Sequence, residues 1–189
     1  VKVARQSNTK VIAHAHGALS IKQAIQSGVH SIEHASLIDE EGIQMAKEYG
    51  VALSMDIYNG DYINEYGIIE GWPEEFLRKN RETTDIQREN FSKAHKSGVK
   101  IVYGTDAGVY PHGNNAKQFK YMIKYGMTNI EAIQSATIHA AEVIGMLDQV
   151  GQIKKGFFAD LIAVKENPML NIQVLENIDV VIKGGRLYK

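Results

Sequence analysis

The stretch VIAHAHG, residues 11–17, decides the fold prediction for this chain. It is short, apolar and flanked by polar residues, which is typical of a buried β-strand. Because side chains alternate along a strand, Ile12, His14 and His16 are expected on one face. Imidazole is the commonest side-chain metal ligand, so this pair of histidines indicates a metal site. The alternative is a pair of satisfied core histidines.

Three further apolar segments follow the same plan. Each comes after a helical pattern that ends in Gly-Val, and they span residues 29–35, 51–58 and 99–104. Strands that alternate with helices indicate a parallel sheet, because a parallel crossover needs a long connection. Four such units amount to half of a (β/α)₈ barrel or to part of an open doubly wound sheet. A complete barrel takes about 250 residues, so a chain of 189 residues is expected to hold only part of one.

Two regions depart from this plan. Residues 59–81 contain glycines and several aromatic side chains, which predicts a long connection. Such connections are often lids or binding loops, and the alternative is a loop that only packs on the surface. Near residue 150 the composition changes, and residues 160–164 and 179–183 have strand patterns. We therefore predict a barrel segment over residues 1–150 and a small β unit over residues 151–189.

The bulk composition narrows the classes of function. The chain has 44% hydrophobic residues, a formal net charge of −1 and no cysteine. It lacks the basic excess of a nucleic-acid-binding protein and any apolar run of the roughly 20 residues that cross a membrane. Without thiolates, a metal site must use histidine and carboxylate ligands. The chain begins at Val1 rather than Met, so we expect a fragment, whose compartment, cytoplasmic or periplasmic in a bacterium, stays open.

Three metal-ligating side chains fall at the carboxyl ends of different predicted strands. They are His14, His34 and Asp106. In a barrel these strand ends meet at one mouth, so distant residues can share an ion. Zinc accepts such nitrogen and oxygen ligands, and a water on zinc loses its proton near neutral pH. A carboxylate beside it can pass that proton to a leaving amine, which predicts hydrolysis of a C–N bond by attack of a metal-bound hydroxide.

Several motifs together resemble the amidohydrolase superfamily. They are His14 in the first strand, SIEHAS over residues 31–36, GTDAG over residues 104–108 and the tail motifs GQI, ADL and KGG. More narrowly, SMDIYN, YGTDAGVYPHG and QSAT are similar to the bacterial zinc-dependent arginine/lysine carboxypeptidases, which are related to imidazolonepropionase and prolidase. This resemblance implies the C-terminal half of a TIM-like barrel, its strands 5 to 8, followed by part of a β-sandwich domain.

The resemblance also implies roles for individual residues. His14 and His34 would bind the second of two Zn²⁺ ions, and Asp106 would ligate the first and carry the proton. His16 would hydrogen-bond the substrate carbonyl or carboxylate. The family's first-strand His-x-His pair and its carboxylated lysine do not occur here, so these ligands are expected upstream. A small peptide substrate and a homo-oligomer are expected, with no nucleic-acid or membrane partner.

Four residues are candidates for substrate recognition. Asp56 ends the third predicted strand and could pair with the guanidinium of a C-terminal Arg, and Asp61 follows it in the loop. Tyr110 and His112 lie in the loop after Asp106 and could line the mouth. For each, the alternative is a capping, solvated or plain loop role.

Other functions stay open at this point. A Xaa-Pro dipeptidase-like or imidazolonepropionase-like enzyme would use the same site. A deaminase would carry a glutamate shortly after the strand histidine, where this chain has Gly17-Ala18-Leu19-Ser20. A half-barrel that lacks the first-half ligands could also be inactive alone and serve a structural role.

Overall fold

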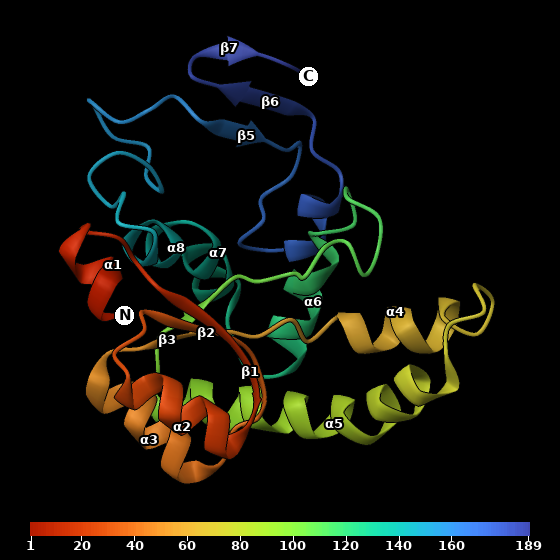
Figure 1. Ribbon diagram of the computed structural model, residues 1–189. Helices are drawn as coiled ribbons and strands as arrows, with labels where there is room; N and C mark the ends of the chain where they lie inside the picture. The colour runs from red at the N-terminus through yellow and green to blue at the C-terminus, as the bar shows by residue number, and fades with distance from the viewer.

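A four-stranded parallel sheet organises the molecule. The computed structural model describes residues 1–189, and the strands follow each other in the order β1-β2-β3-β4 (Figure 1). All three strand pairs are parallel, as the alternation of helices and strands predicts. The strands are β1 (Ile12–Gly17), β2 (Ser31–Leu37), β3 (Ala52–Ser54) and β4 (Ile101–Val102).

Eight helices connect and cover these strands. Helices α2, α3 and α5 pack against β1, β2 and β3, whereas α7 and α8 contact β4. Their bounds are α1 (Lys2–Gln6), α2 (Ala18–Gln26), α3 (Glu40–Tyr49), α4 (Asn59–Tyr66), α5 (Glu74–Ser97), α6 (Lys117–Lys124), α7 (Asn129–Ala136) and α8 (Ile138–Val143). None of these helices has the combined length and hydropathy that crossing a bilayer requires.

The repeated Gly-Val junction has a simple backbone cause. Gly50 and Gly98 end α3 and α5 in the left-handed conformation, with φ of +66° and +80°. Glycine adopts this conformation without the steric cost that a Cβ atom imposes. Each glycine thus turns the chain from a helix into the next buried strand, and the predicted repeat is confirmed.

The two faces of the sheet differ in chemistry. One paired row contains Ile32, Leu53 and Ile101, which are all buried against the helices. The neighbouring row, on the opposite face, begins with His14. Ile12 lies on that face too and is 61% exposed, so the prediction of a fully buried first strand is wrong. β1 is an edge strand of the sheet, and only its helix-facing side is packed.

The predicted long connection over residues 59–81 is largely helical. It contains α4 and the start of α5, which pack side by side and project from the sheet (Figure 1). Gly71, with φ of +72°, lies in the turn between them. α4 and the start of α5 escaped the sequence analysis, because glycine and aromatic residues stood out more than a helical spacing of apolar residues did, whereas residues 84–97 of α5 are the helix that the sequence predicts.

The last forty residues form a second, antiparallel sheet. β5 (Leu161–Ala163), β6 (Val180–Lys183) and β7 (Arg186–Leu187) pair in that order, and β5 and β6 lie within the two predicted strand segments. The intervening 3₁₀ helix, η1 (Ile172–Glu176), contacts α6 and buries Ile172 and Leu175 in the core of the first sheet. Residues after 150 therefore contribute both to the second sheet and to the core of the first sheet. The domain boundary near residue 150 stays a prediction.

One buried amide fixes the segment that leaves β3. Gln118 of α6 is fully buried, accepts a hydrogen bond from the backbone N of Tyr58 and donates another to the backbone O of Met55. Replacing Gln118 by Leu keeps the volume, leaves the backbone N of Tyr58 unpaired and leaves the backbone O of Met55 with only its bond from the backbone N of Ile57. We expect a loss of about 2 to 4 kcal/mol of unfolding free energy in urea titrations. The exposed variant Gln44→Leu is the control, and a Gln118→Leu effect within 0.5 kcal/mol of it, roughly the size of a neutral surface change, would contradict this role.

Candidate metal and active site

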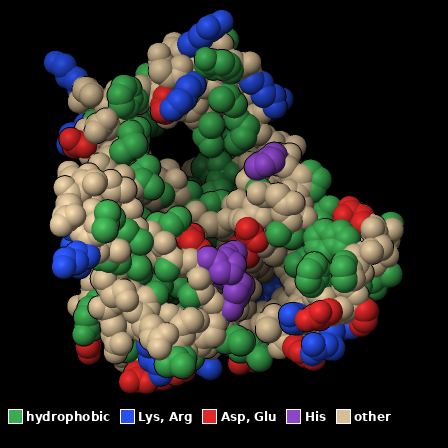
Figure 2. Space-filling model, viewed as in Figure 1, with side chains coloured by type: hydrophobic (Ala, Val, Ile, Leu, Met, Phe, Trp, Pro, Cys, Tyr) green, Lys and Arg blue, Asp and Glu red, His purple; other side chains and the backbone are tan.

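The functional side chains lie where the parallel strands end. His14 is in β1, His34 is in β2, and Asp56 and Asp106 follow β3 and β4. All four line one polar cavity of about 190 Å³. Figure 2 shows histidine side chains beside acidic side chains in a hollow near the middle of the molecule. The structure thus brings together side chains that are up to 92 positions apart in the sequence, from position 14 to position 106.

Two groups of three could each hold a metal ion. The ligand atoms of His14, His16 and His34 lie within 4.8 Å of one another, and so do those of His34, Asp56 and Asp106. The ring centroids of His14 and His34 are 4.4 Å apart. Imidazole nitrogen and carboxylate oxygen are the donors that zinc and similar divalent ions use. The donor set therefore fits a metal centre, with His34 common to both groups.

Asp56 orients His34 rather than standing free. Its Oδ1 lies 2.9 Å from His34 Nδ1, and the carboxylate is only 9% exposed. A carboxylate only accepts hydrogen bonds, so His34 donates from Nδ1 and keeps Nε2 as a ligand atom. A carboxylate behind a ligating histidine is a recurrent arrangement that fixes ring orientation. This contact gives Asp56 a different task from the predicted pairing with a substrate guanidinium.

The backbone is strained at the site itself. His34, Ala35 and Asp106 have positive φ values of 69°, 48° and 50°. Such values are uncommon for residues with a Cβ atom and gather at functional sites. In a regular strand His34 would share a face with Ile32, as the alternation predicts, but Ile32 is buried under the helices while His34 lines the cavity. The left-handed turn explains the difference.

Two residues that the sequence analysis missed hold the carboxylates. Asn59 donates from Nδ2 to Asp56 Oδ2 at 2.6 Å and to Asp106 Oδ2 at 3.2 Å. Gln87 of α5 donates to Asp56 Oδ1 at 3.3 Å. The position of Asn59, three residues after Asp56, is a sequence signal that could have found it. Gln87 ends a polar stripe of α5 that appears only once residues 74–83 are assigned to a helix.

The charges in the site shift the pKa values in opposite directions. The hydrogen bond to Asp56 raises the pKa of His34 against the effect of burial. Burial lowers the pKa of His16, and the nearby His34 and His14 add to this effect. Burial raises the pKa of Asp106, and the charge of Asp56 adds to it. In the metal-free site, His34 is therefore protonated in preference to His16.

Of the remaining predicted site residues, His16 lies in the cluster and the others lie apart from it. His16 belongs to the first of the two groups, and its Nδ1 lies 2.9 Å from Ser36 Oγ. Asp61 accepts hydrogen bonds from Arg88 and Tyr121 and lines neither cavity at the cluster. Tyr110 is buried in contact with other tyrosines, and His112 is exposed outside both cavities.

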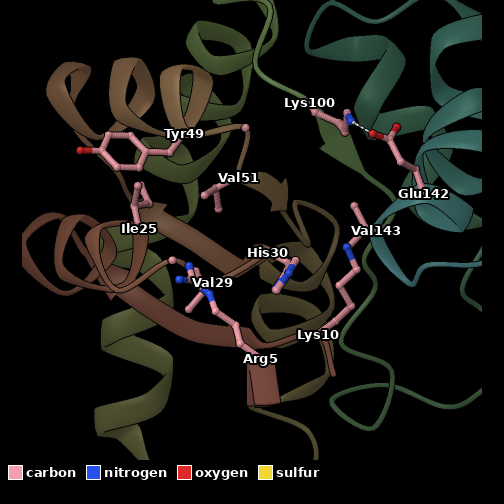
Figure 3. A pocket seen from close by; sticks show the side chains of 12 residues that line it. Arg5, Lys10, Ile25, Val29, His30, Tyr49, Val51, Lys100, Glu142 and Val143 are labelled. Carbon is pink, nitrogen blue, oxygen red and sulfur yellow. Dashed lines mark hydrogen bonds and ion pairs between the residues drawn. The ribbon is translucent and has the colours of Figure 1, made fainter. Parts of the chain in front are cut away.

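Another cavity lies at the opposite, amino ends of the strands. Figure 3 shows Arg5, Lys10 and His30 beside it, together with Lys100, which is paired with Glu142. Its volume is about 320 Å³, larger than the cavity at the histidines. It contains none of the groups whose ligand atoms converge, so the cluster at the carboxyl ends is the stronger candidate for chemistry.

Comparison with known proteins places this arrangement in a family. Residues 1–188 match the sequence profile of the amidohydrolase family, and the chain belongs to that family. It superposes on the crystal structure of a Xaa-Pro dipeptidase with bound methionine, with a TM-score of 0.94 and 43% identity, over 100% of this chain and 47% of that one. The fold is that of the C-terminal half of such a (β/α)₈ barrel.

Two curated relatives extend the comparison. Ochratoxinase of Aspergillus niger is 34% identical over 100% of this chain and 40% of its own length. Imidazolonepropionase of Psychromonas ingrahamii is 25% identical over 73% of this chain and 30% of its own length. The chain thus spans less than half the length of both relatives. The resemblance inferred from the motifs is confirmed at the level of the family.

The raised pKa of His34 predicts a specific titration. In protein freed of metal by a chelator, we expect His34 to titrate above the usual value of about 6.5 and His16 below it. The charged pair of His34 with Asp56 stabilises the fold fully below pH 6.5, and this contribution disappears as the pH rises through the pKa of His34. NMR titration of the ring signals measures both values. Asp56→Asn should lower the pKa of His34, and an unchanged value would refute the assigned cause.

Proposed function

We propose that this chain supplies part of the active site of a metal-dependent hydrolase that cleaves the amide C–N bond of dipeptides or short peptides. One observation carries the proposal: His14, His34 and Asp106 converge from three strand ends on one polar cavity. Membership in the amidohydrolase family supports it. Zinc is the proposed ion, since the site offers imidazole and carboxylate but no thiolate.

Some of these residues would bind the metal ions, and Asp56 would orient one of the ligands. We assign His14 and His34 to one ion and Asp106 to the other, with further ligands expected from the rest of the barrel. When bound, such an ion supplies Lewis-acid polarisation of the scissile carbonyl and lowers the pKa of water. Asp56 keeps Nε2 of His34 directed to its ligand role through the 2.9 Å contact at Nδ1.

Asp106 is the proposed proton carrier. Its Oδ2 accepts a hydrogen bond from Asn59, which fixes the carboxylate plane and leaves Oδ1 for the proton of the attacking water. The same carboxylate then delivers that proton to the leaving nitrogen, which departs as an amine. His16, with Nδ1 in contact with Ser36, offers Nε2 to a substrate carbonyl or carboxylate.

Preference for a C-terminal Arg or Lys is a finer prediction with weaker support. It needs a free carboxylate, whereas Asp61 is paired with the Arg88 guanidinium at 2.7 Å and Asp56 is bonded to His34. The 43% identity to a Xaa-Pro dipeptidase favours Xaa-Pro dipeptides as a second candidate class. Both classes share the amide bond on which the proposal rests.

A panel of small amides tests the reaction. Ala-Pro, Ala-Arg and Ala-Lys are incubated with zinc-loaded protein in which this chain is joined to the rest of its barrel, and the released amino acid is measured by chromatography. We expect hydrolysis of at least one of them, loss of it with a chelator and recovery with zinc, because the ion polarises the bond that breaks. A complete, zinc-loaded barrel that hydrolyses none of these amides would refute the proposal.

Metal affinity tests the assigned ligands without relying on turnover. We expect His34→Ala to remove zinc binding at its site and Asp56→Asn to weaken it by about 10- to 100-fold, because the oriented imidazole loses its partner. Isothermal titration and the metal content per chain give both values. His95→Ala is the matched control, since His95 lies near the end of α5 outside both cavities at the cluster. Wild-type affinity in His34→Ala would show that the metal is bound elsewhere.

A further inference from the structure

Helix α5 presents a polar stripe to the space beside the metal cluster. Asn80, Thr83, Thr84 and Gln87 follow the spacing of one helix face and line a cavity of about 230 Å³. The same cavity reaches His34 and the other histidines and carboxylates of the candidate site. The stripe and the cluster therefore line one continuous cavity.

All four members of the stripe are uncharged. The charged residues of the same helix point elsewhere: the buried Arg88 donates to the backbone O of Ile57 and to Asp61, and the Asp85 side chain is 90% exposed. None of these lines the cavity. The only ionisable side chains there are those of the cluster itself, His14, His16, His34, Asp56 and Asp106.

Contacts between α4 and α5 hold the stripe in place. Asn80 of α5 donates from Nδ2 to the backbone O of Gly60 and to Oδ1 of Asn64, both in α4, each at 2.9 Å. A Cβ atom at Gly60 would lie 2.4 Å from Thr84 Cγ2, so glycine lets the two helices approach closely. The cavity wall is thus formed before a ligand arrives, which lowers the entropic cost of binding.

Two polar atoms of the stripe remain available as hydrogen-bond acceptors. Thr83 Oγ1 donates to the backbone O of Lys79 at 2.9 Å and can still accept a hydrogen bond. Gln87 donates from Nε2 to Asp56 and to the backbone O of His34, and its Oε1 makes no hydrogen bond within the protein. Both atoms can accept a hydrogen bond from a ligand N–H group.

We propose that this cavity is a specificity subsite for an uncharged, hydrogen-bonding side chain of the substrate, such as a carboxamide. This inference rests on the proposed function only for the position of the scissile bond. A carboxamide N–H finds acceptors at Thr83 and Gln87. An ammonium or carboxylate side chain would leave water for the stripe of α5, which offers no counter-charge, while the carboxylates of Asp56 and Asp106 are already bonded to His34 and Asn59. This desolvation opposes binding.

The test compares near-isosteric ligands that differ in charge. The dipeptides X-Gly and Gly-X, with X as Gln, Glu or Lys, are titrated into the protein with and without zinc. Affinity is read from the NMR signals of the Asn80 and Gln87 side-chain amides. In at least one of the two series we expect the Gln dipeptide to bind about tenfold more tightly than its Glu and Lys counterparts, because the site matches an amide.

Matched variants of Thr83 isolate the role of charge. Thr83→Asp and Thr83→Asn have nearly the same shape, so only the added charge differs between them. We expect Thr83→Asp to improve the binding of the Lys dipeptide relative to Gln by about fivefold or more, and Thr83→Asn to leave that ratio unchanged. Lys93→Gln, an exposed site on the same helix, changes the net charge equally and controls for long-range effects.

Each outcome separates this inference from the proposed reaction. Binding with the expected preference but without hydrolysis would refute the hydrolase and keep the subsite. Hydrolysis with equal affinity for all three dipeptides, no binding of any of them, or unchanged ratios in Thr83→Asp would overturn the subsite. Folding of each variant is checked by its thermal transition.

Discussion

In the parallel sheet, His14, Glu33, Ser54 and Val102 are paired neighbours along one row that crosses four strands. The adjacent row packs Ile32, Leu53 and Ile101 against the helices. Because side chains alternate with a period of two, burying the second row places the first on the opposite face. The hydrophobic core thereby sets the register, and the register brings the strand ends to one cavity.

The strand register alone does not complete the site. In a regular strand His34 would point to the same buried face as Ile32, because side chains alternate along the strand. Its left-handed backbone moves it to the cavity, and such a conformation costs on the order of 1 kcal/mol or more. The hydrogen bond from His34 Nδ1 to Asp56 offsets part of this cost. Asp56 is itself held by Asn59 and Gln87. Strain at one residue is thus supported by contacts from β3, α4 and α5.

The difference between local periodicity and long-range side-chain contacts explains which features could be predicted from the sequence. Alternating apolar segments and Gly-Val junctions predict the parallel sheet, since they follow from local periodicity. The meeting of His14, His34 and Asp106 follows from the topology, because carboxyl ends of parallel strands lie together. The partners of Asp56 and Asp61 could not be predicted in this way. Arg88 lies 27 positions after Asp61 and reaches it only because α4 folds back on α5, in a segment predicted as a loop.

Helix α5 links the core to the candidate site. Its last turns bury Phe91 and Ala94 against the sheet, and its middle carries Thr83 and Gln87 beside the cavity. A helix anchored by its apolar end positions its polar end with little freedom, since protein cores are packed closely. The proposed subsite can therefore change through side chains at positions such as 83 while the packing that holds the candidate metal ligands stays the same.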